Sequence, residues 1–173
     1  DGTMVTGWLK INNGTDYDYY YLKGDGSMVT GWRQMDNAWY YFRSDGRCVV
    51  SDWYQINGLW YYFAGNGKMP TGWQQINGSY YCMNTDGRML TGWFLDADGR
   101  WYYLNPVSNG ELGTMMTGWQ WIADEEGTEF CYYFFPQPGG PMGAMAVQTT
   151  TPDGFEVNEQ GRWCVNGTEQ SRR

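Results

Sequence analysis

The chain has 173 residues, a net charge of −8 and few aliphatic residues, a composition that usually favours disorder. It also contains 11 Trp, 15 Tyr and 7 Phe, and each of these rings buries a large area when it packs. An ordered protein with an aromatic core is therefore expected. With 11 Lys and Arg against 19 Asp and Glu, nothing in the sequence suggests a nucleic-acid surface, whereas an acidic surface favours cationic ligands.

No segment approaches the roughly 20 apolar residues of a membrane span, and no charged and then apolar leader opens the chain. The first residues, 1–4, look like the tail of a repeat, so a piece of a longer secreted protein is expected.

The four cysteines are Cys48, Cys82, Cys131 and Cys164. They have no Cys-x-x-Cys spacing, and the chain has no histidine, so no metal site and no cofactor are expected. Disulfides stay open, although scattered buried thiols fit the irregular positions of these residues better.

A repeat of 20 to 26 residues is the main signal in the sequence. The tripeptide Thr-Gly-Trp, or in one copy Ser-Asp-Trp, ends at an anchor tryptophan six times: Trp8, Trp32, Trp53, Trp73, Trp93 and Trp119. Between anchors lies an aromatic run of the type Trp-Tyr-Tyr-Phe, which opens at Tyr19, Trp39, Trp60, Tyr80, Trp101 and Cys131. Six copies in register predict a repeat protein.

Each repeat carries two Asn-Gly or Asp-Gly type turn signals, one before and one after the aromatic run. The turn before the run is expected at residues 36–37, 57–58, 77–78 and 98–99. Because an isolated hairpin is marginal in water, the hairpins must stack. The sequence thus predicts an all-β fold, an elongated β-solenoid of stacked short β-hairpins joined by loops. Residues 1–135 form the array of about six repeats, and 136–173 form a degenerate C-terminal cap and tail.

Folding one repeat about Asn57-Gly58 pairs Trp53 with Tyr62 and Gln55 with Trp60. Strand alternation then puts the two tryptophans on one face as diagonal neighbours. The apolar residues three after each anchor are expected in the core: Ile11, Met35, Ile56, Ile76 and Ile122.

If the hairpins stack, the two tryptophans of one repeat meet the first tyrosine of the next run. We call such a group of three rings a cage. Its electron-rich walls suit a quaternary ammonium ion, which needs no hydrogen bonds and gains cation–π attraction. Four methionines that precede anchors by four residues could close the cages: Met28, Met69, Met89 and Met115.

At these residues the chain strongly resembles the choline-binding repeats, also called cell-wall-binding repeats, of Gram-positive surface proteins and wall hydrolases. Their pattern is nearly intact in 31–53 and 53–73, and the resemblance covers about residues 1–135. It implies choline between consecutive hairpins, with Trp32 and Trp39 against Tyr61, Trp53 and Trp60 against Tyr81, and Trp93 and Trp101 against Tyr132. Weaker cages are Trp73 and Tyr80 with Tyr102, and Trp8 and Tyr19 with Tyr40, because tyrosine replaces the second tryptophan. Cys131 stands where Trp119 should find its partner, and no sixth cage is assigned there.

The resemblance implies a non-catalytic module that anchors a secreted protein to the choline of (lipo)teichoic acid on the cell wall. A catalytic domain in the full-length protein and a homodimer stay open. Related repeats of glucan-binding domains and clostridial toxins bind carbohydrate, so a glucan or glycan ligand is the alternative, and a purely structural stalk a further one. The paired carboxylates lie in turns, and without histidine a catalytic triad is excluded.

Overall fold

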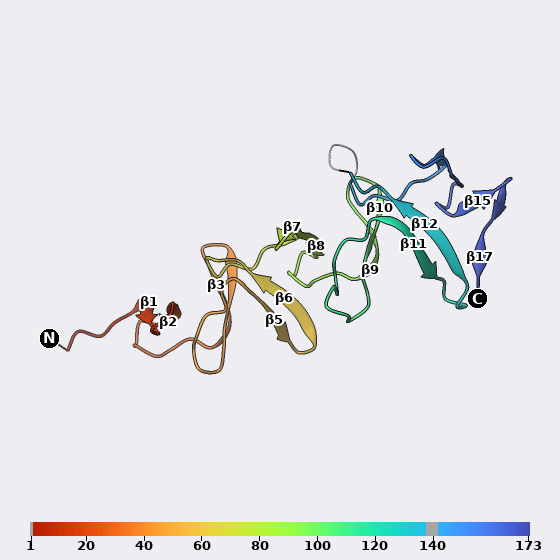
Figure 1. Cartoon of the computed structure of the whole chain (residues 1–173). Helices are drawn as coiled ribbons and strands as arrows, with labels where there is room; N and C mark the ends of the chain where they lie inside the picture. Colours follow the sequence, from red (N-terminus) through yellow and green to blue (C-terminus); the bar gives the residue numbers. More distant parts are fainter. Residues whose placement is uncertain (1, 138–141) are drawn as a thin grey trace. The chain divides into compact units, whose positions relative to one another are not determined.

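The computed structural model describes residues 2–137 and 142–173, and these form strands and turns without any helix. The predicted all-β fold of short hairpins is confirmed (Figure 1). Residues 138–141, which belong to the Gly-Pro cluster of the expected cap, and residue 1 lie outside the described residues.

Seventeen strands follow one another along the chain. They are β1 (Gly7–Asn12), β2 (Tyr17–Leu22), β3 (Gly31–Met35), β4 (Ala38–Phe42), β5 (Asp52–Ile56), β6 (Leu59–Phe63), β7 (Gly72–Ile76), β8 (Ser79–Met83), β9 (Gly92–Leu95), β10 (Trp101–Leu104), β11 (Gly118–Ala123), β12 (Glu129–Phe134), β13 (Thr149–Thr150), β14 (Glu156–Val157), β15 (Trp163–Val165), β16 (Thr168–Glu169) and β17 (Ser171–Arg172). Strands β1 to β10 form five separate two-stranded hairpins. The sixth hairpin, β11–β12, gains β17 as a third strand, and β13 to β16 form a four-stranded sheet.

The register of the hairpins agrees with the sequence prediction. In β5–β6, Trp53 pairs with Tyr62 and Gln55 with Trp60. The hairpin β3–β4 repeats this register, with Trp32 opposite Tyr41. Both central residues of these turns have positive φ, 50° and 81° at Asn57 and Gly58, and 48° and 59° at Asp36 and Asn37, a conformation that Asn, Asp and Gly adopt most readily.

The turn predicted at Asp98-Gly99 is different. Strand pairing stops at Leu95 and Trp101, which leaves a five-residue loop, and Asp98 is not among the residues with positive φ. The Asp98 carboxylate instead accepts the N–H of Arg100 at 2.9 Å. One residue more separates anchor and run here than in the repeats anchored at Trp32, Trp53 and Trp73, so a two-residue turn would break the register.

Consecutive hairpins are joined by one recurring backbone hydrogen bond. The N–H of Met69 donates to the carbonyl of Trp39 at 2.8 Å, and Met89 binds the carbonyl of Trp60 in the same way at 2.9 Å. In the later repeats the same bond joins Met115 to Tyr80 and Met145 to Trp101, and in the first repeats Cys48 to Tyr19. Each repeat is thus bonded to the next through the run-opening aromatic residue.

A glycine makes room for the side chains of Met69, Met115 and Met145. A Cβ on Gly87 would overlap the sulfur of Met69, and a Cβ on Gly143 would overlap that of Met115. Both glycines have φ near +80°, so they are needed for the backbone conformation as well as for the close approach.

The core lies between the hairpins and is built from the run. The residue that ends each run is fully or nearly fully buried in five repeats: Phe42, Phe63, Met83, Leu104 and Phe134. The first tyrosine is buried at Tyr40, Tyr61, Tyr102 and Tyr132. Around Phe42, Phe63 and Phe134 the core clusters include tyrosines of the preceding hairpin.

The predicted core position at Ile11 is wrong, because this side chain is 46% exposed. Its counterpart Ile56 is buried in a cluster with Val49 and with Tyr41 of the preceding repeat. Ile11 belongs to none of the core clusters of the described residues. Ile56, Ile76 and Ile122 are buried as expected, and Met35 is partly buried.

The chain divides into two compact units. The first comprises Asp1–Gln74 and Met83–Met89, and the second Gln75–Cys82 and Leu90–Arg173. Within the second unit, β17 returns to the sixth hairpin and pairs Arg172 with Glu129. The division into a repeat array and a cap at residue 136 stays a prediction.

Candidate ligand-binding site

The Trp32 cage consists of Trp32, Trp39 and Tyr61, all in the first unit. The ring centroids of Trp32 and Trp39 lie 6.1 Å apart at 90°, and Trp32 and Tyr61 lie 4.9 Å apart at 73°. Trp32 is held from below by Tyr41 at 5.2 Å and Phe63 at 5.8 Å. Two indoles at right angles form a corner, and the tyrosine of the following hairpin forms its third wall.

This corner opens into a cavity of about 330 Å³ lined by the three rings together with Met69, Thr85, Asp86 and Arg88. Arg88 is ion-paired to Asp86 at 3.9 Å, so the rim carries one positive and one negative charge. The side chains of Trp32 and Trp39 are 36% and 41% exposed. The walls therefore face the solvent, although their bases pack on the core.

The Trp93 cage repeats this geometry in the second unit. Trp93 and Trp101 lie 6.2 Å apart at 87°, and Trp93 and Tyr132 lie 4.9 Å apart at 75°. Tyr103 and Phe134 support the anchor at 5.0 Å and 5.9 Å. Both anchor and run-opening tryptophan are exposed here too. Two cages in different repeats thus agree within about 0.2 Å and a few degrees.

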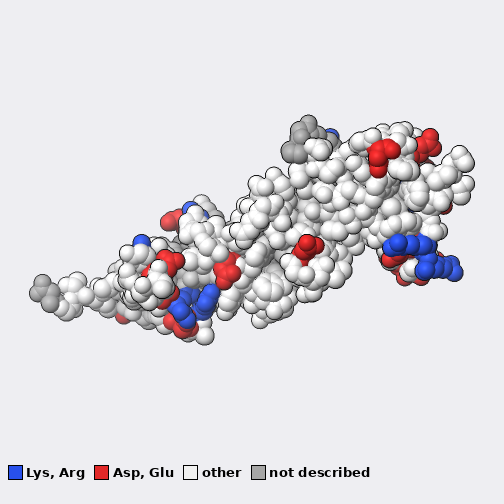
Figure 2. Space-filling view, in the orientation of Figure 1, with Lys and Arg blue, Asp and Glu red and all other residues white. Residues whose placement is uncertain are grey.

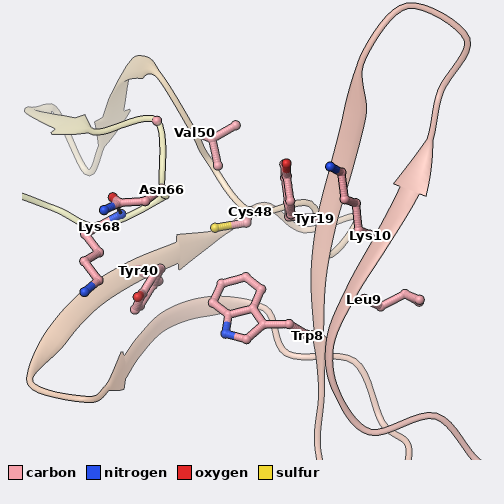
Figure 3. A pocket seen from close by; sticks show the side chains of 10 residues that line it. Trp8, Leu9, Lys10, Tyr19, Tyr40, Cys48, Val50, Asn66 and Lys68 are labelled. Atoms are coloured by element: carbon pink, nitrogen blue, oxygen red, sulfur yellow. Dashed lines mark hydrogen bonds between the residues drawn. The ribbon is translucent and has the colours of Figure 1, made fainter.

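The Trp8 cavity, of about 520 Å³, contains Trp8, Tyr19 and Tyr40 as predicted neighbours but has a different rim (Figure 3). Trp8 and Tyr40 lie 5.2 Å apart. The lining also includes Lys10 and Lys68, and the ammonium of Lys10 lies 3.7 Å from the ring centroid of Tyr17 and 5.6 Å from that of Tyr19. The protein's own ammonium groups, those of Lys10 and Lys68, therefore line this aromatic cavity.

Two further predicted cages draw residues from both units. These are Trp53 and Trp60 with Tyr81, and Trp73 and Tyr80 with Tyr102. They stay predictions. Within the hairpin β5–β6, Trp53 packs on its cross-strand partner Tyr62 at 5.2 Å.

A cluster at the sixth hairpin was missed by the sequence prediction. Trp119, Trp121, Cys131, Phe155 and Trp163 line a cavity of about 230 Å³. The signal that could have found it is the extra tryptophan two residues after the sixth anchor, directly opposite Cys131 in the strand register.

The cysteines are all buried, and Cys48, Cys131 and Cys164 are free thiols. Burial raises the pKa of Cys48 to about 12 and that of Cys82 and Cys131 to about 11. At neutral pH these groups are therefore protonated and poor metal ligands. Across the described ranges, no three His, Cys, Asp or Glu side chains gather as a metal site.

The charged side chains are dispersed. On the face in Figure 2, most of the surface carries no charge, and basic and acidic groups lie close together in several places. Among the ion pairs of the described residues, Asp45 and Arg47 are 2.7 Å apart, and Asp98 and Arg100 are 2.8 Å apart. In the part of the chain that the structure covers, no helix has the length and hydrophobicity of a membrane span.

Comparison with known proteins agrees with this geometry. Residues 29–69 and 70–114 match the family model of the choline-binding repeat. No curated protein matches the chain.

Solved structures give a wider match. Choline-binding protein F from Streptococcus pneumoniae, determined in the presence of a peptidoglycan analogue, is 37% identical, with a TM-score of 0.78, over 95% of this chain and 48% of its own. CbpJ from the same organism is 38% identical, with a TM-score of 0.76, over 92% of this chain and 48% of its own. The pneumococcal modular autolysin LytC shares the fold, at 23% identity and a TM-score of 0.60, over 97% of this chain and 42% of its own.

The chain spans about half the length of these similar structures. The paired tryptophans Trp32 and Trp39 lie within the first matched segment, and Trp93 and Trp101 lie within the second. This protein therefore carries repeats of the choline-binding family.

Proposed function

We propose that this module binds the trimethylammonium groups of choline in its aromatic cages, and so attaches the protein that contains it to a choline-bearing polymer such as teichoic acid on a bacterial surface. The observation that carries the proposal is the Trp–Trp corner closed by a tyrosine, which occurs with the same geometry around Trp32 and Trp93.

A trimethylammonium ion fits such a corner because it is cationic, bulky and cheaply desolvated. Each well-placed ring contributes about 0.5 to 2 kcal/mol of cation–π attraction. The cage around Trp32 offers three rings, and the polarizable side chain of Met69 adds a contact on the cavity wall. The Asp86 carboxylate on the rim supports a bound cation at short range.

Exposure supports binding over simple core packing. A tryptophan that served only to fill the core would be buried, yet Trp39 and Trp101 are each more than 40% exposed. In the described residues, the ring contact of Trp39 is with Trp32, and that of Trp101 is with Trp93. Such positions are costly for a soluble protein unless a ligand covers them.

Several weak cages on one array act together on a repeating polymer. After the first cage is occupied, the next binding event is intramolecular and sees a high effective concentration of choline. This avidity makes the module an anchor, with the bacterial cell surface as its place of action. In this proposal the repeats bind and do not catalyse, and any enzymatic activity belongs to other parts of the full protein.

The test is a titration of intrinsic tryptophan fluorescence with choline, tetramethylammonium, ammonium and dextran. Saturable changes with the two quaternary ions and none with ammonium or dextran are expected. A response to dextran alone would instead support the glycan alternative, because aromatic rings also stack on sugars. No response to any ligand would leave a structural stalk.

A further inference from the structure

The cavity at the sixth hairpin lies where the repeat pattern breaks. The anchor Trp119 packs on its cross-strand partner Tyr133 at 5.1 Å, as Trp32 packs on Tyr41. The run, however, opens with Cys131 and offers no indole beside the anchor.

The missing indole is supplied from the opposite strand. Cys131 pairs directly with Trp121 across β11–β12. In the regular repeat the same cross-strand pair is Gln34 opposite Trp39, and in the Trp93 cage it is Leu95 opposite Trp101. Directly paired residues point to the same face of the sheet with their Cβ atoms about 5 Å apart. In the sixth hairpin the tryptophan of this pair thus stands on the first strand instead of the second, and it lies on the same face of the hairpin as in the regular repeat.

Phe155 takes the place of the third wall. The turn after β14, closed by the bond from the Gly161 N–H to the Asn158 carbonyl, matches the turn after β6, closed between Gly67 and Ala64. Counting back from these turns, Phe155 stands where Tyr61 stands in the Trp32 cage. Its ring lies 5.8 Å from that of Trp119 at 86°.

Trp163 takes the place of the methionine. By the same count it corresponds to Met69, two residues after the turn glycine. Its ring lies 6.2 Å from Trp119, 6.3 Å from Trp121 and 5.9 Å from Phe155. The thioether of the regular cage is thus replaced by a third indole.

The charges around this cavity suit a cation. The Asp153 carboxylate accepts the indole N–H of Trp119 at 2.8 Å. Its pKa is lowered by hydrogen bonds from Thr151 and Trp119, so it is ionised at neutral pH. The basic group Arg172 lies 4.4 Å from the Trp121 ring and is paired with Glu129, and neither Arg172 nor Asp153 is among the residues that line the cavity.

Stability alone does not explain Trp163. Its indole N–H is buried and has no hydrogen-bond partner among the described residues, which costs folding free energy. A phenylalanine would avoid that cost, whereas tryptophan is the strongest cation–π acceptor of the aromatic side chains.

We infer that Trp119, Trp121, Phe155 and Trp163 form an additional cage for a quaternary ammonium ion, built by exchange of a tryptophan between paired strands. The inference rests on the proposed function and extends it to a site that the repeat pattern does not assign.

The test uses the full chain labelled with 5-fluorotryptophan and observed by fluorine NMR, with signals assigned by single Trp→Phe variants. Choline and tetramethylammonium should shift the signals of Trp121 and Trp163 saturably, as well as that of Trp39. The neutral isostere 3,3-dimethylbutanol should bind at least about tenfold more weakly. Equal binding of the isostere would overturn the inference, because it would show a merely apolar cavity.

Failure of the inference is distinguishable from failure of the proposed function. If Trp39 responds to choline and Trp121 and Trp163 do not, the additional cage is wrong and the proposed function stands. If none of the three responds, both are wrong.

Two variants sharpen the test. Trp121→Leu should weaken the choline response of Trp163 about tenfold. Adding Cys131→Trp rebuilds the arrangement of Leu95 opposite Trp101 and should restore the response. An unchanged Trp163 response in Trp121→Leu would overturn the inference, and that single variant decides even if the double variant does not fold.

Discussion

The Trp32 and Trp8 cavities have equivalent phenylalanines beneath the anchor tryptophan, which we call the floor, and they differ in the residues at the rim. Trp32 lies 5.8 Å from Phe63, and Trp8 lies 5.7 Å from its counterpart Phe42. At the rim, however, the first cavity has Trp39, Met69 and the Asp86–Arg88 pair. The second has Tyr19, Cys48, Asn66 and Lys68 at the matching positions, and Lys10 in place of Gln34.

The difference teaches that aromatic residues alone do not make a cation site. Both cavities have the ring positions that the repeat requires for folding. One rim is electrically balanced, whereas the other carries two ammonium groups next to the rings that would bind a cation. Like charges at short distance oppose binding. We therefore expect the Trp32 cage to bind choline more tightly than the Trp8 cavity.

The largest effect on stability is expected at the two equivalent floor residues, Phe63 and Phe42. Phe63→Ala and Phe42→Ala should each lower the free energy of unfolding by about 3 to 5 kcal/mol, because both rings are fully buried. Chemical denaturation measures this loss. Leu59→Ala, at an exposed position of the same hairpin as Phe63, is the control and should change stability little. Unequal losses at the two phenylalanines would show that the floors are not equivalent.

The next largest effect concerns choline affinity at the rim of the Trp32 cage. Trp39→Ala should weaken choline binding at the Trp32 cage by about 10- to 30-fold, because it removes one cation–π wall. It should change the thermal midpoint little, since the ring is 41% exposed. Calorimetric titration of the variant gives both the affinity and the number of sites. If the variant lost stability and kept its affinity, Trp39 would be a core residue.

A gain of binding is expected at the Trp8 cavity. Lys10→Gln installs the residue found at the same place in β3 and removes an ammonium beside Tyr19, so choline should bind there about threefold more tightly. Comparison of Tyr19→Trp with Tyr19→Phe, in each background, shows whether the choline response comes from the Trp8 cavity. Lys23→Gln, in the connecting turn, is the charge-matched control. No gain in Lys10→Gln would mean that the rim charge does not limit this cavity.

The smallest effect at neutral pH concerns the sulfur position. Cys48 replaces the methionine of the other repeats, and burial raises its pKa to about 12 from an ordinary value of 9.0. The folded protein therefore keeps this proton longer than the unfolded chain, so stability is full below about pH 9 and falls as the pH rises towards 12. Cys48→Ala should make this fall shallower, and near pH 7 it should lower stability much less than the loss of a phenylalanine ring, because it removes only one buried sulfur atom.

The measurement is urea denaturation of the parent and the variant between pH 7 and 11. Only the difference between the two curves is informative, because the raised pKa values of Tyr102, Cys82 and Cys131 act in the same direction. Parallel curves would show that Cys48 does not titrate with unfolding.

Much of the Trp32 cage could be predicted from the sequence, because strand alternation and a two-residue turn leave one register. The pairing of Gln34 with Trp39 and the resulting Trp–Trp corner follow from those two facts alone. The predictions of a two-residue turn at Asp98-Gly99 and of a buried Ile11 were wrong. Turn residues do not fix loop length when the spacing changes, and burial of a strand residue depends on side chains from other segments, as Val49 and Tyr41 provide for Ile56.

The rim charges and the exchanged tryptophan could not be predicted from motifs. Lys10 and Lys68 are far apart in the sequence and meet only in three dimensions. Trp121 falls outside the repeat motif, and its role follows only from its pairing with Cys131. A motif records which positions the fold needs, whereas a site also depends on what neighbouring repeats bring to it.

The bond from each methionine N–H to the run-opening carbonyl has a consequence for how such chains diverge. The bond itself involves main-chain atoms only, and a glycine leaves space for the sulfur at Met69 and Met115. A hairpin can therefore be duplicated, deleted or exchanged by recombination while its neighbours keep their contacts. Selection on ligand preference can then act on single wall residues, as the different rims of the Trp8 and Trp32 cavities illustrate.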